Sequence, residues 1–326
     1  MKALVCREFQ SLEHLKIEEL PSPVPEKGQV LVSVKYASVN FPDALIVQGK
    51  YQFKPALPFT PGSECSGVVK SVGPGVTRLK PGMNVLVIMP AGAFAEEALA
   101  HESQVVPLPP ALDMMSAAGM PMTYGTCLHA LQDRAQLQSG ETLLVLGAGG
   151  GIGLAAVELG KIMGATVIAA ASSHEKLEAA KSRGADHLIH YTKEDLRARL
   201  KEITGDKGVD VVCDPVGGDF AEPALRSIAW KGRYLVVGFA AGDIPKIPLN
   251  LALLKGCSIV GVFWGEFMKR QPQDAMTEMG QLLQWLAQGK INPMISQTFA
   301  MSHAHAALHA VYARQVTGKV VITMGV

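Results

Sequence analysis

The segment that most constrains the fold is a run of glycines between an apolar stretch and a helical pattern. Five glycines fall within positions 147–153, directly after the apolar residues 143–146 and before a helical pattern that extends to Ala165. Glycine weakens both strands and helices. A run of glycines at this junction therefore indicates that the backbone must come close to something that side chains would block. The segment predicts a strand, a tight turn and a helix. Gly147 and Gly149 are interpreted as relaxing the end of the strand.

An A-x-G-x-x-G pattern fits Ala148, Gly150 and Gly153, in the strand–turn–helix context that a dinucleotide-binding loop requires. Gly150 would let the backbone approach a pyrophosphate, and Gly153 would let the helix pack closely against the strand. The phosphates would sit on free N–H groups at the start of the helix, and Gly151 belongs to the same turn. The alternative is a tight turn that binds no ligand.

The residues that follow the next apolar run favour NADP over NAD. An acidic residue about 20 positions past the glycines usually binds an unmodified ribose. Here that position is Ala171, followed by Ser172 and Ser173, whose hydroxyls could receive a 2′-phosphate together with Lys176. The alternative for Lys176 is an exposed helix residue, and the nearby Glu175 and Glu178 are the features that oppose the NADP interpretation.

The rest of the chain predicts an α/β protein with two domains. From about residue 122, six short apolar runs alternate with helical segments, which is typical of a doubly wound parallel sheet covered on both faces. The first 120 residues read mostly as short strands separated by Pro-Gly turn signals, which suggests a compact barrel-like domain. We expect a β-rich catalytic domain over residues 1–121, a nucleotide-binding domain over 122–265, and a segment over 266–326 that returns to the first domain.

Charge and cysteine content limit the possible partners. The formal net charge is +1 and no run of five like charges occurs, which argues against nucleic acid and anionic membrane as partners. No secretory signal and no apolar run of about 18 residues is visible. The five cysteines are far apart and form no C-x-x-C pair, so they are interpreted as scattered apolar residues in a reducing cytoplasm.

Several motifs resemble the medium-chain dehydrogenase/reductase superfamily, and within it the zinc-free quinone oxidoreductases. The resemblance covers essentially the whole chain and rests on "SVNFPDALIVQGKY", "PMTYGTCLHAL", "GAGGGIG", "GRYLVVGFAAG" and "TGKVVI" in that order. It implies a GroES-like domain, a Rossmann domain and a cleft between them. It also implies homodimers that pair the edge strands of the Rossmann sheets, here the apolar residues 257–264.

The resemblance also implies where a catalytic zinc would be bound in zinc-dependent relatives. This chain carries Asn40, Ser63 and Ala118 at those positions, which is not a plausible set of zinc ligands. The cysteine-rich lobe that holds a structural zinc in such relatives is missing too. His305 and His309 are interpreted as ordinary residues of the final helix. We therefore expect no metal.

By the same resemblance, the residues that would bind NADPH can be assigned one by one. Strand-end packing is the alternative for the apolar members of this set. The pyrophosphate loop corresponds to Gly150, Gly151, Ile152 and Gly153, and the 2′-phosphate pocket to Ser172, Lys176 and Tyr191. An arginine of the return segment corresponds to Arg314. The residues around the nicotinamide half correspond to Thr126, Val216, Gly238, Phe239, Phe263 and Trp264.

Reduction of an acceptor requires a hydride donor and hydrogen-bond donors for the developing oxyanion. Asn40 offers an amide N–H but cannot release a proton at neutral pH. Tyr51 carries a phenol that can, and it resembles the position of a catalytic tyrosine in enoyl-thioester reductases. The alternative for Tyr51 is an aromatic residue that stacks on a flat substrate. Asp43 is expected to orient the loop that carries Asn40.

These residues predict an NADPH-dependent reductase that transfers a hydride to a planar acceptor, a quinone or another activated enone, without zinc or flavin. The first alternative is an enoyl-thioester (enoyl-CoA) reductase that uses Tyr51 as its proton donor. No basic patch for coenzyme A is evident beyond Lys269 and Arg270. The second alternative is a protein that binds NADPH without catalysis.

Overall fold

A computed structural model describes residues 1–325, and the chain divides into two compact units. Unit 1 comprises Met1–Met122 and Pro293–Val326, and unit 2 comprises Thr123–Asn292. The expected boundary at residue 265 differs from this division, because residues 266–292 group with unit 2. Their main element, α10 (Pro272–Ala287), packs against α9 (Trp264–Arg270) of the same unit.

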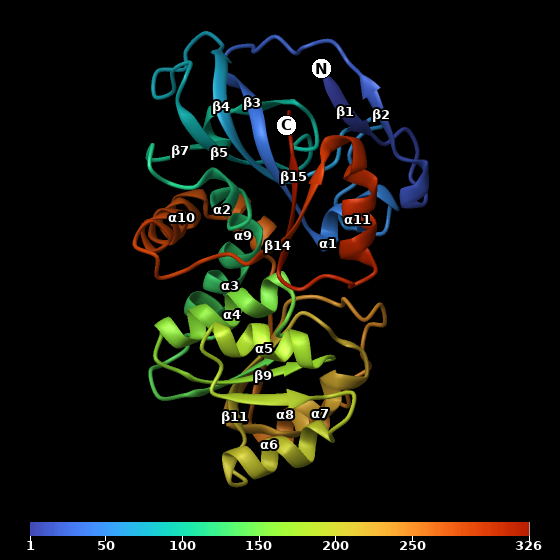
Figure 1. Cartoon of the computed structure of the whole chain (residues 1–326). Coiled ribbons are helices and arrows are strands. Elements are labelled where there is room, and N and C mark those ends of the chain that lie inside the picture. Colours follow the sequence, from blue (N-terminus) through green and yellow to red (C-terminus); the bar gives the residue numbers. More distant parts are fainter. Residues whose placement is uncertain (326) are drawn as a thin grey trace. The chain divides into compact units, whose positions relative to one another are not determined.

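Unit 1 is built mainly from antiparallel strands (Figure 1). Its strands are β1 (Lys2–Val5), β2 (Lys16–Glu19), β3 (Gln29–Val39), β4 (Glu64–Val72), β5 (Asn84–Ile88), β6 (Glu97–His101), β7 (Val105–Pro107), β14 (Ile295–Ala300) and β15 (Lys319–Thr323). Its α-helices are α1 (Phe41–Val47), α2 (Met114–Ala118) and α11 (Ala304–Tyr312).

The central strand of unit 1 is β3, which pairs with β4, β6 and β15. Because β15 lies at the end of the chain, its pairing with β3 brings Lys319 next to residues about 280 positions earlier. Alternate residues of β3, including Val30, Val32 and Val34, face the buried core. This alternation is the period-2 pattern of a strand with one face on the core.

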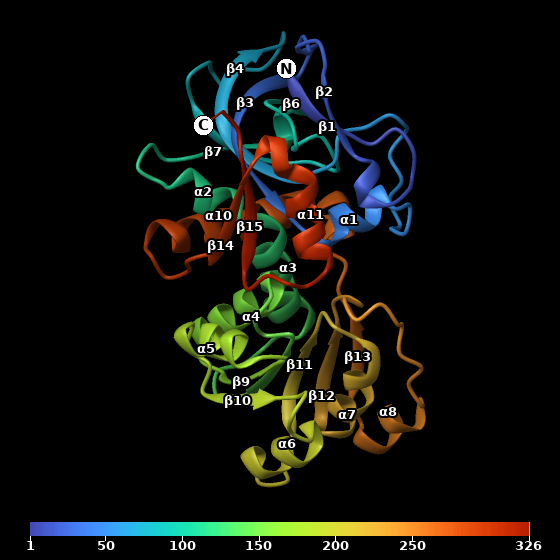
Figure 2. The same ribbon diagram turned by 45° about the vertical axis from the view of Figure 1, so that its right-hand side comes forward.

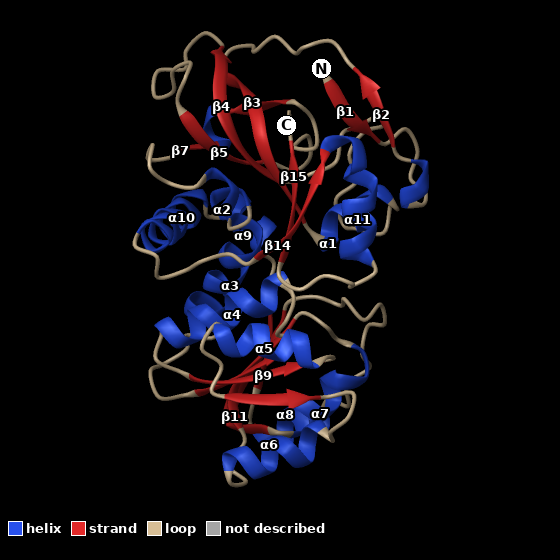
Figure 3. Cartoon of the chain, in the orientation of Figure 1, coloured by secondary structure: helices blue, strands red, loops and turns tan. Residues whose placement is uncertain are grey.

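Unit 2 is a parallel sheet with helices on both faces (Figures 1 and 3). Its strands are β8 (Thr142–Leu146), β9 (Thr166–Ala171), β10 (His187–His190), β11 (Val209–Asp214), β12 (Ile228–Val236) and β13 (Ser258–Gly261). Its α-helices are α3 (Thr126–Leu128), α4 (Gly151–Ile162), α5 (His174–Ser182), α6 (Leu196–Thr204), α7 (Ala221–Arg226), α8 (Asn250–Lys255), α9 and α10.

The strand order of unit 2 is β10-β9-β8-β11-β12-β13, with every neighbouring pair parallel. The prediction of a doubly wound parallel sheet is confirmed, and each of the six apolar runs forms a strand. Helices α4 and α5 cover one face, and α6, α7 and α8 cover the other (Figure 3). β12 begins five residues earlier than its apolar run, because Ile228 pairs with Val209 ahead of a register shift.

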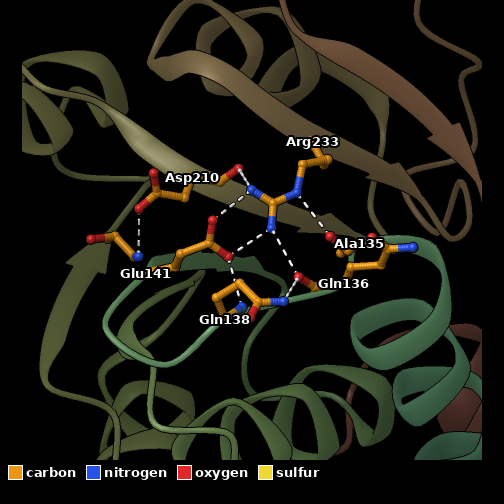
Figure 4. Close-up of polar contacts among 7 residues, drawn as sticks. Ala135, Gln136, Gln138, Glu141, Asp210 and Arg233 are labelled. Carbon is orange, nitrogen blue, oxygen red and sulfur yellow. Dashed lines mark hydrogen bonds and ion pairs between the residues drawn. The ribbon is translucent and has the colours of Figure 1, made fainter.

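The amino ends of the central strands are held by Arg233 (Figure 4). Its guanidinium donates to both carboxylate oxygens of Glu141, at 2.8 and 2.6 Å, and its Nε donates to the Ala135 carbonyl at 2.9 Å. Asp210 completes the network by accepting from the Thr142 N–H at 2.7 Å. These contacts join β8, β11 and β12 to the segment that precedes the sheet.

All five cysteines are free, and four of them are buried. Within residues 1–325, no helix combines the length and the apolar character that crossing a lipid bilayer requires.

Candidate functional site

Two of the predicted nucleotide-site segments of unit 2, the glycine loop and Val216, follow the carboxyl ends of neighbouring strands. After β8 the chain winds outward through β9 and β10, and it then returns to the other side of β8 at β11. β8 and β11 therefore flank the point where the winding direction reverses, which is where open α/β sheets bind ligands. The glycine loop follows β8, and Val216 follows β11, so both lie at this point.

The glycine loop closes tightly between β8 and α4. Gly147 has a left-handed backbone (φ 61°), and a Cβ on it would lie 2.7 Å from Val216. The N–H of Gly150 donates to the Gly147 carbonyl at 3.0 Å, and Gly150 is the N-cap residue of α4. No side chain caps this helix. Its first-turn N–H groups, from Gly151, Ile152 and Gly153, are thus available to an anion.

The structure gives Gly147 and Gly149 more specific roles than relaxing the strand end. Gly147 supplies the left-handed turn. A Cβ on Gly149 would lie 2.4 Å from the Cβ of Lys176, so Gly149 makes room for the stem of that lysine. Lys176 therefore lies against the glycine loop and is half-buried. This placement brings the lysine predicted to bind a 2′-phosphate next to the predicted pyrophosphate loop.

Ser172 and Ser173 lie between β9 and α5, but they are placed differently. Ser172 is exposed. Ser173 is the N-cap of α5, and its Oγ accepts from the Lys176 N–H at 3.4 Å. A capping hydroxyl keeps its own hydrogen for donation, so both serines retain a donor for a phosphate.

Asp214, at the end of β11, organises the loop that contains Val216. Its Oδ1 accepts from the N–H groups of Val216 and Gly217, each at 2.8 Å, and its Oδ2 accepts from the Tyr234 hydroxyl. Burial, and then the charge of Asp214, raise the pKa of the Tyr234 phenol. Asp214 was not among the predicted site residues, although a carboxylate at the end of a buried apolar run is a signal that could have identified it.

The other predicted nucleotide-site residues of unit 2 lie in different environments, some exposed and some buried. Tyr191 packs against Phe220 with ring centroids 4.1 Å apart. Gly238 and Phe239 follow β12, and the Gly238 N–H donates to the Asp214 carbonyl at 3.3 Å. Phe263 is exposed after β13, whereas Trp264 and Thr126 are buried. A Cβ on Gly125 would lie 2.5 Å from the indole of Trp264, so this tryptophan serves packing within unit 2.

The predicted catalytic residues Asn40 and Asp43, and the predicted cofactor residue Arg314, belong to unit 1. Arg314 follows α11 in a left-handed conformation (φ 58°). Asn40 is the N-cap of α1, and its backbone N–H donates to Asp43 Oδ2 at 2.8 Å. Burial raises the pKa of Asp43 to about 7; the Asn40 N–H and the Lys319 ammonium oppose this rise, and the charge of Glu64 adds to it.

The Asn40 side chain is held at both ends by two buried charged residues. Its Nδ2 donates to Glu64 Oε1 at 2.7 Å, and Lys319 Nζ donates to its Oδ1 at 2.5 Å. Lys319 Nζ also donates to Glu64 Oε1 at 3.0 Å, and the Met122 N–H donates to Glu64 Oε2 at 2.7 Å. Asn40 is therefore an anchored amide rather than an unengaged donor.

Glu64 and Lys319 are residues that sequence reasoning missed. Each is a buried charged residue at the first position of a strand, β4 and β15 respectively. A buried charge generally needs a partner of opposite sign, so each position is a recognisable signal. The identity of the partner depends on the pairing of β3 with both β4 and β15.

Tyr51 lies in the loop after α1 and is half-buried. Burial, and then the charge of Asp43, raise the pKa of its phenol. The hydroxyl therefore keeps its proton near neutral pH and can donate it. Phe53 and Leu57 in the same loop are exposed, so an apolar surface lies close to Tyr51 in sequence.

The positions that carry zinc ligands in zinc-dependent relatives hold one amide, one hydroxyl and one methyl group here. Ser63 and Ala118 are both buried. Within the same residues, no group of three or more His, Cys, Asp and Glu side chains is arranged to hold a metal ion.

Comparisons with known proteins agree with this architecture. Residues 26–110 match the family model "Alcohol dehydrogenase GroES-like domain", and residues 151–285 match "Zinc-binding dehydrogenase". The chain is 38% identical to quinone oxidoreductase-like protein 2 of Rattus norvegicus over 325 residues, covering 99% of this chain and 92% of the relative.

A homologue of the same protein in Nematostella vectensis is 41% identical over 298 residues, covering 90% of this chain and 81% of the relative. Among solved structures, Escherichia coli quinone oxidoreductase complexed with NADPH superposes with a TM-score of 0.92 at 26% identity, covering 99% of this chain and all of that one. The chain belongs to the medium-chain dehydrogenase/reductase superfamily, in its quinone oxidoreductase-like branch.

Proposed function

We propose that this protein is an NADPH-dependent reductase that transfers a hydride to a planar activated acceptor, a quinone or an enone, without zinc or flavin. The observation that carries the proposal is the set of side chains at the positions that carry the catalytic zinc ligands in zinc-dependent relatives. Asn40 stands at one of these positions, with its amide bonded to Glu64 and Lys319. An amide, a hydroxyl and a methyl group do not fit zinc, so the site favours hydrogen bonding to the acceptor oxygen.

The residues of this chain divide the remaining tasks. When bound, NADPH supplies the hydride. Asn40 holds an N–H toward the oxygen on which negative charge develops, and Tyr51 provides the proton that neutralises it. Asp43 fixes the Asn40 backbone through the cap of α1. The uncapped start of α4 and the Gly149–Lys176 contact provide the phosphate sites.

The proposal is tested by mixing the purified protein with NADPH and a panel of acceptors in a stopped-flow spectrometer. The panel contains benzoquinones and naphthoquinones, simple enones and an enoyl-CoA thioester, and the loss of NADPH absorbance is followed. We expect turnover with quinones or enones. Turnover confined to the thioester would make the protein an enoyl-thioester reductase, and no oxidation with any acceptor would refute the proposal.

Lys176→Ala is expected to weaken NADPH binding about 10- to 100-fold, because it removes a charge-assisted contact to the 2′-phosphate. NADH binding should change less than about threefold, since NADH lacks this phosphate. Titration of nucleotide fluorescence measures both affinities. Lys181→Ala, on the same helix, is the matched control and should affect neither. Equal losses for NADPH and NADH would contradict the assignment of Lys176.

Tyr51→Phe is expected to lower kcat by about 10²-fold if the phenol is the proton donor. The substitution keeps the ring, so a purely stacking residue would lose little activity. The measurement is steady-state turnover with the best acceptor, with NADPH affinity determined in parallel. Tyr36→Phe on β3 controls for the loss of a hydroxyl elsewhere in unit 1. A kcat within about twofold of the parent would assign Tyr51 to substrate stacking instead.

We further propose that two copies of the chain pair through β13. This strand is the edge of the six-stranded sheet, beside β12 (Figure 2). An unpaired apolar edge is a template for another strand. Apolar side chains also gather on and near α8, where Trp230, Leu249, Leu253 and Leu254 are 68–80% exposed. The ring of Trp230 lies against Gly256 at the end of this helix, so α8 extends the apolar surface beyond the edge strand.

The double variant Ile259→Lys/Leu253→Lys is expected to convert the dimer to a monomer, because it places two charges on an apolar surface. Sedimentation equilibrium measures the molecular mass. Val24→Lys is the control, since Val24 is equally exposed but belongs to unit 1. A parent protein that is monomeric at all accessible concentrations would refute the dimer.

A further inference from the structure

Unit 1 buries a cluster of three charged side chains. Asp43, Glu64 and Lys319 are 1%, 0% and 4% exposed. Burying an ion pair costs desolvation that the attraction between its members often fails to repay, and apolar residues of similar size are commonly at least as stabilising. The Glu64–Lys319 pair is therefore weak evidence for stability, and its retention points to a role in the chemistry.

The contacts within the cluster fix the orientation of the Asn40 amide. Lys319 can only donate, so it must face Oδ1, and Glu64 can only accept when ionised, so it must face Nδ2. Because Lys319 also donates to the same Glu64 oxygen, the three groups form a closed ring. The amide cannot flip without breaking both of its contacts.

Two N–H hydrogens, one on Asn40 Nδ2 and one on Lys319 Nζ, are not used by the hydrogen bonds of the ring. The Asn40 Nδ2 carries two hydrogens and gives one to Glu64, while Lys319 Nζ carries three and gives one each to Asn40 and Glu64. Within residues 1–325, neither remaining hydrogen has an acceptor. In a buried site, an ammonium bonded to the amide oxygen polarises the amide and strengthens its remaining N–H as a donor.

We propose that Lys319 is a positioning residue of the reductase: paired with Glu64, it locks Asn40 with one N–H free and supplies the positive charge that stabilises the oxyanion of the reduced acceptor. This role rests on the proposed function. Hydride addition forms a C–H bond on the acceptor and moves a π-electron pair onto its oxygen, with the cofactor oxidised to NADP⁺. The oxygen stays negative until Tyr51 protonates it, and this is the interval in which the buried cation acts.

The test uses 4-nitrophenol as a stable mimic of the oxyanion, because only its phenolate absorbs strongly in the visible range. The probe is titrated into the NADP⁺ complex across a pH series. We expect the parent to bind the phenolate at least tenfold more tightly than the phenol. Glu64→Gln, which leaves the lysine charge uncompensated, is expected to increase this preference. Lys319→Met is expected to abolish it, and Lys319→Arg to retain it.

Lys319→Met leaves Glu64 buried without its partner, so this variant can fail to fold. The double variant Glu64→Gln/Lys319→Met removes both charges together and avoids that difficulty. It is expected to bind NADPH as the parent does, to lose the phenolate preference, and to lower kcat at least tenfold with little change in KM for NADPH. Circular dichroism and thermal melting verify folding of each variant.

The outcomes separate this inference from the function on which it rests. If the parent reduces quinones while the double variant keeps both the phenolate preference and its kcat, the role of Lys319 is wrong and the reductase assignment stands. If Glu64→Gln raises the preference for phenolate over phenol and Lys319→Met lowers it, the role is supported. A general structural defect would change this preference in the same direction in both variants. If no acceptor oxidises NADPH in the parent, the proposed function itself fails, and the phenolate titration still reports on the cation.

Discussion

Gly150→Ala is expected to fold as the parent does and to bind NADPH about 10- to 100-fold more weakly. Nothing in the protein requires glycine at this position. Its backbone (φ −83°, ψ 173°) suits any residue, and the nearest atom to an added Cβ is the Gly147 carbonyl oxygen at 3.6 Å. Stability without nucleotide should even rise by about 0.5 kcal/mol, because alanine restricts the unfolded chain.

The expected loss of affinity comes from the ligand alone. A methyl group at position 150 would occupy the space through which a pyrophosphate approaches the first-turn N–H groups of α4. Fluorescence titration with NADPH gives the affinity, and thermal melting without nucleotide gives the stability. If Gly150→Ala binds NADPH as tightly as the parent does, the loop is a structural turn and the nucleotide assignment is wrong.

Gly153→Ala is the matched comparison, because here the constraint comes from the protein. An added Cβ would lie 2.2 Å from the Gly147 carbonyl oxygen and 2.5 Å from the Ala148 Cα. Both are backbone atoms that cannot rotate away. We expect destabilisation of about 1 to 3 kcal/mol or more without any ligand present. The same substitution at these two nearby positions thus separates a glycine needed for packing from one needed for binding.

Local patterns explain why the fold was largely predictable from the sequence. The strand–glycine–helix segment and the alternation of apolar runs with helices depend on residues close together in the chain, and they led to the correct sheet. Tertiary packing decided the details that were not predicted. The register shift that lengthens β12 depends on its pairing with β11, and the placement of α10 in unit 2 depends on its packing against α9.

The candidate site was predictable only in part, for the same reason. The glycines and Lys176 follow a spacing rule, although the contact between Gly149 and Lys176 became visible only in the folded loop. Glu64 and Lys319 are 255 positions apart and meet only because β3 pairs with strands from both ends of the chain. Trp264 matched a family position, yet its indole is buried against Gly125, which no local pattern reveals.

Arg233→Met is expected to destabilise the protein by about 2 to 4 kcal/mol. The substitution removes a bidentate contact and leaves Glu141 partly buried without its cation (Figure 4). For a unit of this size, each kcal/mol lowers Tm by about 2–4 °C. Arg226→Met is the control, because Arg226 makes an exposed pair with Glu222 one helical turn away, and such pairs contribute about 0.5 kcal/mol or less.

The pH dependence of the Arg233→Met effect has a definite sign. Burial raises the pKa of Glu141, but the hydrogen bonds from Arg233 and from the Gln138 N–H outweigh it and leave the pKa below the ordinary value. A lowered pKa contributes stability above the unfolded-state pKa, and this stability is lost as pH falls through the folded-state value. The destabilisation caused by the substitution should therefore be larger at pH 7 than near pH 4.

Arg233→Met should lower the stability and leave NADPH binding unchanged, whereas Gly150→Ala should keep the stability and weaken NADPH binding. Arg233 holds the amino ends of the strands, whereas the glycine loop follows the carboxyl end of β8. Parallel strands keep these ends about 15 Å or more apart, so Arg233→Met should leave NADPH affinity unchanged well below its melting temperature. Weaker binding by folded Arg233→Met protein would mean that the two ends of the sheet are coupled, and the separation of scaffold from site in unit 2 would be wrong.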